Sequence, residues 1–323
     1  YQGRRIILSR NSIYNIFSKS DSIYIRGKKF GKGIRFYSED DFIRVNGKRY
    51  RDTILVLLDD GKLKIINELG IEGYLYGVLP KEVSPSWPIE ALKAQAVVSR
   101  TYVLNNIGRF EKKGYDLCST YLSQVYGGVE VERPETTIAV EETRGEVLTY
   151  NGELAKVFFH SNSGGYTADV KYVWGMDIPY LKGRKDKYSI NSPQYRWKKR
   201  IKKDFILKKL RKEGYKIGKI KRIKLKGRTR SKRVKYFIIY TDKGKIKINS
   251  NRFRMICGPE IIRSTLIENL EMKGDSFIFE GRGWGHGVGL SQWGARNMAL
   301  EGYNYRKILR FYFPGTKIEK WDY

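Results

Sequence analysis

The chain has 323 residues and a formal net charge of +30, with 64 Lys and Arg against 34 Asp and Glu. This length is enough for one large domain or two ordinary ones. The charge favours anionic partners such as nucleic acid, anionic lipid or acidic cell-wall polymer. The sequence contains neither the unbroken apolar run of a membrane-spanning helix nor a signal peptide at Tyr1. If the protein is exported, we expect its leader or anchor to lie outside this sequence.

Residues 1–49 are predicted to form a β-rich module that leads into the rest of the chain. Short β-branched or alternating runs, with turns at Lys32-Gly33, Asn46-Gly47 and Asp60-Gly61, are typical of strands joined by tight connections. The strands are expected at 6–8, 22–26, 42–45, 53–58 and 63–66.

The stretch 77–88 carries one carboxylate, Glu82, among three prolines and ahead of a long amphipathic helix. Pro80, Pro85 and Pro88 each fix a backbone torsion and disfavour helix in the preceding residue, so we expect residues 80–88 to be a stiff, non-helical loop. The apolar periodicity that follows predicts a core helix over 88–107. Glu82 is then either a solvated acid in a loop or a catalytic acid that the stiff loop holds in place.

A second group of polar residues follows a predicted strand at 155–159. The turn Asn151-Gly152 predicts a tight hairpin into this strand, and residues 160–165, which include His160, follow its end. A helix is expected at 134–143 and a strand at 145–150. Polar residues at a strand end commonly line a site.

Residues 196–250 form the most basic part of the chain, with Lys and Arg interleaved with Ile, Leu and Val. We predict a helix at 204–214 and strands at 219–226, 234–240 and 245–249. This is a small α+β subdomain with one strongly basic face. Such a face either has a specific partner or is simply solvated.

A glycine-rich stretch, 281–289, surrounds His286 and follows a strand predicted at 277–280. Its glycines allow close approach of the backbone to another group. It has neither the Gly-Lys-Ser/Thr ending of a phosphate loop nor the dinucleotide-binding pattern. Helices are expected at 290–301 and 305–312.

Metal and cysteine chemistry have few candidate groups. Cys118, Cys257, His160 and His286 lack close ligand spacing, so a structural zinc site is not expected. The two cysteines could pair, stay free or bind something. A Cys-His nucleophile is possible in principle, but neither Cys has a supporting sequence context. No nucleic-acid motif accompanies the basic charge.

Glycan cleavage by paired carboxylates requires two acids across the scissile bond, and Glu82 has no obvious second acid. A single acid suffices where the substrate supplies its own nucleophile.

Several motifs together resemble the stage II sporulation protein D family, from about residue 50 to the C-terminus. They are residues 67–82, Trp87–Tyr102, Gln124–Gly128, Phe159–Thr167, Val173–Gly175 and Gly281–Ala295. The resemblance implies a peptidoglycan lytic transglycosylase that needs no cofactor and cuts the β-1,4 bond between N-acetylmuramic acid and N-acetylglucosamine. Glu82 matches the family's catalytic acid.

The resemblance also implies residues that bind or support the glycan. They are Arg100, Gln124, Tyr126, His160, Ser161, Ser163, Trp284, His286, Ser291 and Gln292. Arg100, like Gln95, is also compatible with a purely structural role in its helix. Family members that bind zinc have Cys, then Thr-His-Cys before the Gln-Val-Tyr motif. Here Leu122 and Ser123 replace the His and the second Cys, so we expect no metal.

The expected architecture is α+β: a core with a glycan-binding groove, a β-rich N-terminal module (1–49) and an inserted basic subdomain (196–250). The core then comprises 50–195 and 251–323. The expected location is outside the cytoplasm, with glycan strands as partner and an amidase as a further one. The alternatives are a non-catalytic glycan-binding protein or amidase activator, a hydrolase that uses water, and a nucleic-acid-binding protein.

Overall fold

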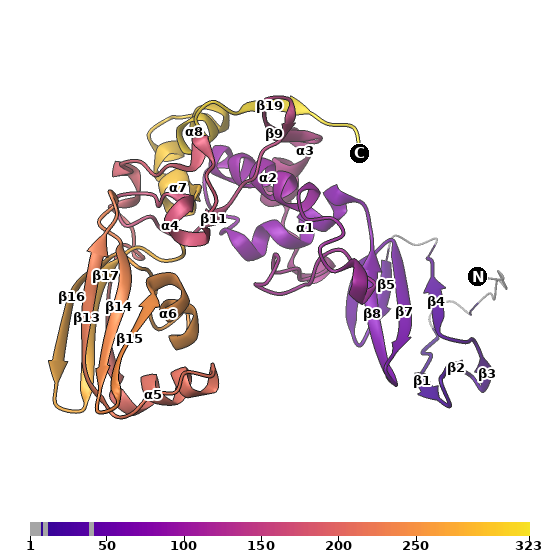
Figure 1. Ribbon diagram of the computed structural model, residues 1–323. Coiled ribbons are helices and arrows are strands. Elements are labelled where there is room, and N and C mark those ends of the chain that lie inside the picture. The colour runs from indigo at the N-terminus through magenta and orange to yellow at the C-terminus, as the bar shows by residue number, and fades with distance from the viewer. Residues whose placement is uncertain (1–7, 9–11, 39–41) are drawn as a thin grey trace. The chain divides into compact units, whose positions relative to one another are not determined.

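The structure is a computed structural model that describes residues 8, 12–38 and 42–323, and it is a mixed α+β fold as expected (Figure 1). The chain divides into two compact units. The first comprises residues 1–81 and 108–132, and the second comprises 82–107 and 133–323. The predicted core segment 50–195 is therefore shared between the units. No helix among the described residues is long and apolar enough to cross a membrane.

The first unit is rich in short antiparallel strands, in agreement with the predicted β-rich module. Its sheets have the orders β1-β2-β3, β4-β7-β8 and β5-β6. The strands are β1 (Ile16–Lys19), β2 (Ser22–Ile25), β3 (Lys28–Lys29), β4 (Gly33–Phe36), β5 (Phe42–Val45), β6 (Lys48–Arg51), β7 (Thr53–Asp59) and β8 (Lys62–Glu68). The strand predicted at 6–8 falls almost entirely outside the described residues.

Two of the three turns predicted in this unit are confirmed, whereas the turn predicted at Lys32-Gly33 lies one residue earlier, because Gly33 already begins β4. Asn46-Gly47 and Asp60-Gly61 all have positive φ, as the hairpin turns β5–β6 and β7–β8 require. Ile23, Ile54 and Val56 form the buried core beneath the strands. The unit also contains most of helix α1 (Ile71–Glu82) and the short 3-10 helices at Glu111–Lys113 and Val129–Val131.

The expectation that residues 80–88 are non-helical is wrong at its start. Pro80 lies inside α1, and Glu82 is the last residue of that helix, so the non-helical segment covers only 83–88. A proline lacks the N–H for the i→i−4 bond and strains the preceding turn. Pro80 stands two residues before the helix end, where α1 has few further bonds to lose.

The second unit contains two hydrophobic cores, the first of which is built around α2 (Ile89–Leu104). Pro88 immediately precedes this helix, as its fixed torsion favours. The other elements around this core are α3 (Pro134–Glu142), β9 (Glu146–Tyr150), β10 (Glu153–Leu154), β11 (Phe159–His160), α4 (Val170–Trp174), β18 (Leu290–Ser291), α7 (Gln292–Leu300), α8 (Tyr305–Tyr312) and β19 (Lys317–Lys320). The strand predicted at 155–159 is reduced to Phe159–His160.

The second core is formed by the basic segment 196–250 together with the elements that follow it, up to Arg282. Its elements are β12 (Arg196–Lys202), α5 (Lys203–Lys212), β13 (Ile220–Arg228), β14 (Val234–Thr241), β15 (Gly244–Asn249), α6 (Ser250–Cys257), β16 (Ile267–Lys273) and β17 (Ser276–Arg282). Two sheets form, β13-β14-β15 and β12-β17-β16. Trp197, Phe253 and Phe279 share this core, which therefore extends past residue 250.

Candidate functional site

Two of the predicted site segments lie side by side in the second unit. Strand β11 pairs in parallel with β18, so that Phe159 faces Leu290 and His160 faces Ser291. The Asn162 and Trp284 backbones exchange hydrogen bonds of 3.0 and 2.8 Å. The two polar stretches that the sequence singled out, 159–165 and 281–292, are thus one structural feature, the paired loops.

The glycines of 281–289 serve this close pairing. A Cβ added to Gly285, whose φ is +113°, would stand 2.6 Å from the His160 Cβ. A Cβ on Gly289 would stand 2.1 Å from the Phe158 carbonyl oxygen. Real Cβ atoms do not come so close, so the His160 segment can lie against this loop only where the loop has no side chain.

His160 and His286 lie together in the paired loops, with ring centroids 5.5 Å apart. The His160 Nδ1 lies 3.0 Å from the Val288 carbonyl oxygen, and the His286 Nδ1 lies 3.1 Å from the Val288 amide nitrogen. Since a carbonyl only accepts and an amide only donates, His160 carries its proton on Nδ1 and His286 carries its proton on Nε2. Nε2 of His160 is consequently an unprotonated acceptor, buried and without a partner among the described residues.

Both imidazoles are neutral at physiological pH. Burial, followed by repulsion from Arg254, lowers the pKa of His286 to about 3. Burial, followed by repulsion from His286 and Arg233, holds the pKa of His160 well below its usual value. Desolvation disfavours the charged form of an imidazole. The pair can therefore accept or donate hydrogen bonds without carrying charge.

Two of the three predicted serines of the paired loops, Ser163 and Ser291, are buried and hydrogen-bonded, whereas Ser161 is half-buried. The Ser163 hydroxyl donates to Asp186 Oδ2 at 2.7 Å and lies 2.7 Å from the Ser189 hydroxyl. Ser291 caps α7, accepting from the amides of Ser163 and Gly294. Both serines lack exposed surface, so they shape the loops rather than contact a ligand.

Asp186 is a member of this network that the sequence did not single out. It is fully buried, accepts from the Tyr312 hydroxyl at 3.2 Å and has a pKa raised mainly by burial. Its neighbours in sequence are Lys185 and Lys187, so by pattern it resembles a solvated acid. Only the fold shows that it closes the network.

Trp87 and Trp293 connect the Glu82 segment to the paired loops. Their ring centroids lie 5.1 Å apart with a 59° tilt, and the Trp293 amide donates to the Ser161 carbonyl oxygen at 3.0 Å. Glu82, half-buried, precedes Trp87 by five residues in the same unit. Beside Trp293, the Gln292 amide reaches Gln95 Oε1 at 3.5 Å.

Aromatic side chains also surround His286 and Trp284. The exposed Trp174 ring lies 4.8 Å from the His286 ring, and the Arg263 guanidinium covers the Trp284 ring at 4.2 Å. Aromatic faces next to polar groups suit sugar rings, which present one apolar face and a rim of hydroxyls. Of these residues, the sequence reasoning selected only Trp284 and His286 as site residues.

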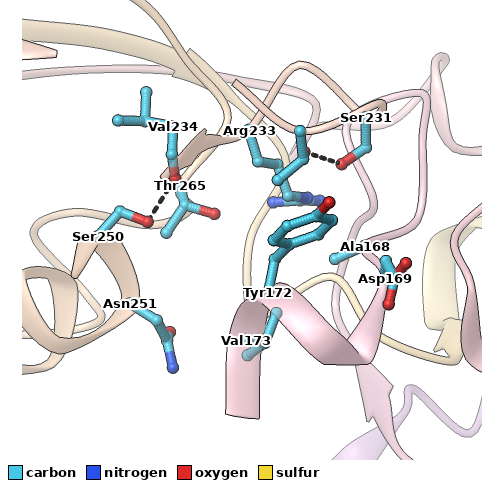
Figure 2. A pocket seen from close by; sticks show the side chains of 11 residues that line it. Ala168, Asp169, Tyr172, Val173, Ser231, Arg233, Val234, Ser250, Asn251 and Thr265 are labelled. Atoms are coloured by element: carbon cyan, nitrogen blue, oxygen red, sulfur yellow. Dashed lines mark hydrogen bonds between the residues drawn. The ribbon is translucent and has the colours of Figure 1, made fainter. Parts of the chain in front are cut away.

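Arg233 ties the basic segment to the paired loops. Its guanidinium is buried and donates to the carbonyl oxygens of Ser163 and Tyr166 at 2.7 and 3.3 Å. Burial, with repulsion from Arg254 and Arg282, lowers its pKa to about 9. Figure 2 shows Arg233 with Tyr172 and Ser231 in the wall of a cavity of about 10 Å³, which holds one water molecule at most and no sugar.

Arg100 lies in the interior rather than at a surface. Its side chain is fully buried and donates to the carbonyl oxygens of Val140 and Glu146, each at 3.1 Å. It thereby joins α2 to α3 and β9. A contact between Arg100 and glycan, as the resemblance implies, does not fit this position, and the structural alternative does.

Gln124 and Tyr126 belong to the first unit. The Tyr126 hydroxyl donates to Asn67 at 2.8 Å, its ring stacks on Tyr74 at 5.3 Å, and burial raises its pKa. Gln124 is fully buried, and its amide nitrogen and oxygen have no hydrogen-bond partner among the described residues. A buried amide without partners costs free energy, which marks Gln124 as a residue retained for more than packing.

The residues around Cys118 do not fit a zinc ion. Its Sγ lies 3.3 Å from the Thr120 hydroxyl and 3.5 Å from the Ser123 hydroxyl, and zinc sites use thiolate, imidazole or carboxylate groups instead. In the part of the chain that is described, no three His, Cys, Asp or Glu side chains are grouped to hold a metal. Cys118 and Cys257 are both free thiols.

Two family models match parts of this chain. The family model described as Stage II sporulation protein matches residues 59–150, and a domain of unknown function, DUF8618, matches residues 179–289. The second match covers the whole of the basic segment 196–250 and the whole glycine-rich stretch 281–289.

Three relatives align over most of this chain. An uncharacterized protein of Brachyspira hyodysenteriae is 34% identical over 90% of the chain and 77% of its own length. The Stage II sporulation protein D of Bacillus subtilis is 31% identical, over 80% of the chain and 76% of its own length. The Amidase enhancer of Bacillus subtilis is 30% identical over 96% of the chain, which spans half of that protein.

The first family model covers Glu82 and the helix that follows it, and the second covers the glycine-rich stretch around His286. The chain therefore belongs to the stage II sporulation protein D family.

Proposed function

We propose that this protein is a lytic transglycosylase that cleaves the β-1,4 bond between N-acetylmuramic acid and N-acetylglucosamine in peptidoglycan glycan strands. Family membership supports a cell-wall role. The proposed place of action is outside the cytoplasm, where the glycan is. The glycan would lie in a groove bordered by the paired loops and their aromatic neighbours.

The proposed reaction needs one carboxyl group. Glu82 donates its proton to the glycosidic oxygen as the bond from the muramic C1 breaks. Its carboxylate then takes the proton of the muramic C6 hydroxyl, whose oxygen attacks C1 and closes a 1,6-anhydro ring. Atoms balance without water, and the enzyme ends in its starting protonation state. This reaction explains how one acid can suffice where paired-carboxylate enzymes use two.

The observation that carries the proposal is the Trp87–Trp293 contact. It links the short segment that begins at Glu82 to the Ser161 backbone, and through it to both histidines. Glu82 lies at a helix end and is followed by the Pro-rich segment 83–88, so its backbone is restrained. Of the two neutral histidines, His286 is the one with exposed surface, and it would offer the glycan a polar ring without charge.

Products identify the reaction. Glycan strands, with and without stem peptides, are incubated with wild type, with Glu82→Gln and with Glu153→Gln, an exposed control acid on β10. Mass spectrometry should find 1,6-anhydro-muramic ends with wild type and Glu153→Gln and none with Glu82→Gln. Products one water heavier would make the protein a hydrolase.

A second candidate function is activation of a cell-wall amidase. The relative named Amidase enhancer, which aligns over 96% of this chain, favours it. An activator needs the glycan surface but not the acid. Stimulation of a purified amidase by Glu82→Gln as strong as by wild type, together with no glycan cutting by either protein, would establish this function and reject the transglycosylase.

A further inference from the structure

The three-stranded sheet β13-β14-β15 has one covered face and one uncovered face. Figure 1 shows α5 and α6 together on one side of this sheet. The Phe253 ring of α6 packs against Phe237 of β14, with centroids 4.2 Å apart and a tilt of 31°, and Ile223, Ile239 and Ile248 are buried with them. Since side chains alternate along a strand, the residues between these point to the other face.

The uncovered face has a regular composition that the strand register defines. On the central strand β14, Tyr240 stands between Arg222 of β13 and Lys245 of β15, and Ile238 stands between Lys224 and Lys247. Tyr236 stands between Lys226 and Asn249. The basic sheet face, as we call it, therefore consists of a Tyr-Ile-Tyr stripe flanked by cations: Arg222, Lys224, Lys226, Lys245 and Lys247.

None of these five cations forms an ion pair with any of the described residues, and all five are exposed. The neighbouring sheet is different. On the outer face of β12-β17-β16, Lys198 pairs with Glu280 at 2.6 Å and Arg282 pairs with Glu268 at 2.7 Å. The cations of the neighbouring sheet are thus partly neutralised by carboxylates, whereas those of the basic sheet face are not.

The two tyrosines hold cations close to the sheet. Arg222 lies over the Tyr240 ring at 4.2 Å, and Lys247 lies over the Tyr236 ring at 4.0 Å. Cations on one strand repeat every other residue, about 6.7 Å apart, and the two flanking strands are separated by roughly 10 Å. A single polymer chain running along β14 would have positive charge on both sides.

This geometry favours a polymer whose charges project from its rings. A base stacks on an open aromatic face, and a cation covers one face of each of these two tyrosine rings. A duplex groove about 12 Å wide is read by a protruding helix or ribbon, not by a flat sheet. A glycan strand, by contrast, carries carboxylates on the lactyl groups of muramic acid or on stem peptides, at intervals along its length.

We propose that the basic sheet face binds peptidoglycan glycan strands through their carboxylates. It would be a second glycan-binding surface, in addition to the paired loops. This rests on the proposed cell-wall function but not on Glu82. It assigns a role to the part of the chain that matches the domain of unknown function. Such a surface would keep the enzyme on its polymeric substrate between cuts.

The test compares two variants that lose the same charge. The first replaces the five cations of the basic sheet face by Gln. The second replaces Arg196, Lys198, Arg200, Lys202 and Lys273, which lie on the other sheet, by Gln. Both are made in the Glu82→Gln background, so that no strand is cut. Sedimentation with teichoic-acid-free glycan strands measures binding, and thermal melting checks the fold.

The first variant should bind glycan about tenfold more weakly, which corresponds to about 1.4 kcal/mol, and the second less than threefold more weakly. Strands whose carboxylates have been converted to amides should bind the parent protein as weakly as intact strands bind the first variant. Equal losses in both variants, or unchanged binding of amidated strands, would overturn the proposal.

A single-stranded oligonucleotide is the competing ligand. Tighter binding of oligo(dT) than of glycan, lost in the first variant alone, would assign the face to nucleic acid instead. The outcome is independent of catalysis. Glycan binding that depends on this face, without any anhydro products, would reject the transglycosylase and keep this surface. Anhydro products together with glycan binding that does not depend on this face would keep the transglycosylase and reject this surface.

Discussion

His160 and His286 bind opposite polar groups of the same residue. The His160 ring donates to the Val288 carbonyl oxygen, and the His286 ring accepts from the Val288 amide, with the ring centroids 5.5 Å apart. One backbone unit thereby fixes both tautomers. A small shift of the glycine-rich loop would move both rings and change which nitrogen each presents.

The two histidines should make stability depend on pH between 7 and 5. In the unfolded chain each titrates near pH 6.5, whereas in the folded protein the pKa of each is lowered. The unfolded state then binds more protons below about pH 6.5, so stability falls as the pH falls. We expect a loss on the order of 1–2 kcal/mol per histidine, measured by urea unfolding.

These are the only two histidines in the chain, so the imidazole contribution to this pH window comes from them alone. The double variant His160→Gln/His286→Gln is the control. Its absolute stability is not the readout, because the substitutions also remove packing. Its unfolding free energy should change little between pH 7 and pH 5, and a slope as steep as that of wild type would contradict the assignment.

Gly285→Ala should disrupt the contact between the paired loops. The new Cβ would meet the His160 Cβ at 2.6 Å, and the backbone has a φ of +113° that side chains rarely adopt. We expect a loss of about 3 kcal/mol, made up of backbone strain and overpacking. Gly302→Ala also has positive φ but open space around it, so it should lose only about 1 kcal/mol. Equal losses would show that the contact is unimportant.

Arg100→Met should destabilise the second unit without involving the glycan. It removes the donors to the Val140 and Glu146 carbonyl oxygens, which are buried with it. The Val140 carbonyl oxygen keeps bonds of 3.3 Å from the Thr143 amide and hydroxyl, so the main loss is the donor to Glu146. A buried acceptor left unpaired costs about 1–3 kcal/mol, so we expect a loss of about 2 kcal/mol in urea unfolding. Arg200→Met, at an exposed site, should stay within about 0.5 kcal/mol.

Trp87→Ala should lower glycan cutting at least tenfold while the protein stays folded. It removes the ring that packs against Trp293 and so releases the segment that begins at Glu82. The aromatic contact contributes about 1 kcal/mol beyond its buried area, so folding should survive. Product formation is measured by mass spectrometry alongside Trp87→Phe, which should retain most activity, and Trp321→Ala, which should retain all of it.

Local signals were sufficient for many elements of this fold. The helices α5 and α8 and the strands β14, β15 and β17 lie within one or two residues of their predicted positions, since each has clear periodicity and a turn at its end. The glycines of 281–289 indicated a close backbone approach before any partner was known. The motifs that carry the family resemblance, including those around His160 and His286, could also be recognised from the sequence alone.

Contacts between distant segments could be decided only by the tertiary structure. The sequence does not show that Trp87 meets Trp293, that Asp186 is buried behind Ser163, or that Arg233 reaches the paired loops from the basic segment. Each depends on burial, and burial is a property of packing rather than of local pattern. Pro80 shows the same limit, because its residue type argues against the helix in which it lies.

The basic sheet face illustrates the division most clearly. By itself, the sequence determined an alternation of Lys and Arg with apolar residues along β13 and β15, and therefore two faces of opposite character. It could not say which cations would find carboxylates. The fold decided this by placing Glu268 and Glu280 beside the cations of the neighbouring sheet and none beside Lys224 or Lys247, because ion pairing depends on spatial neighbours rather than on composition.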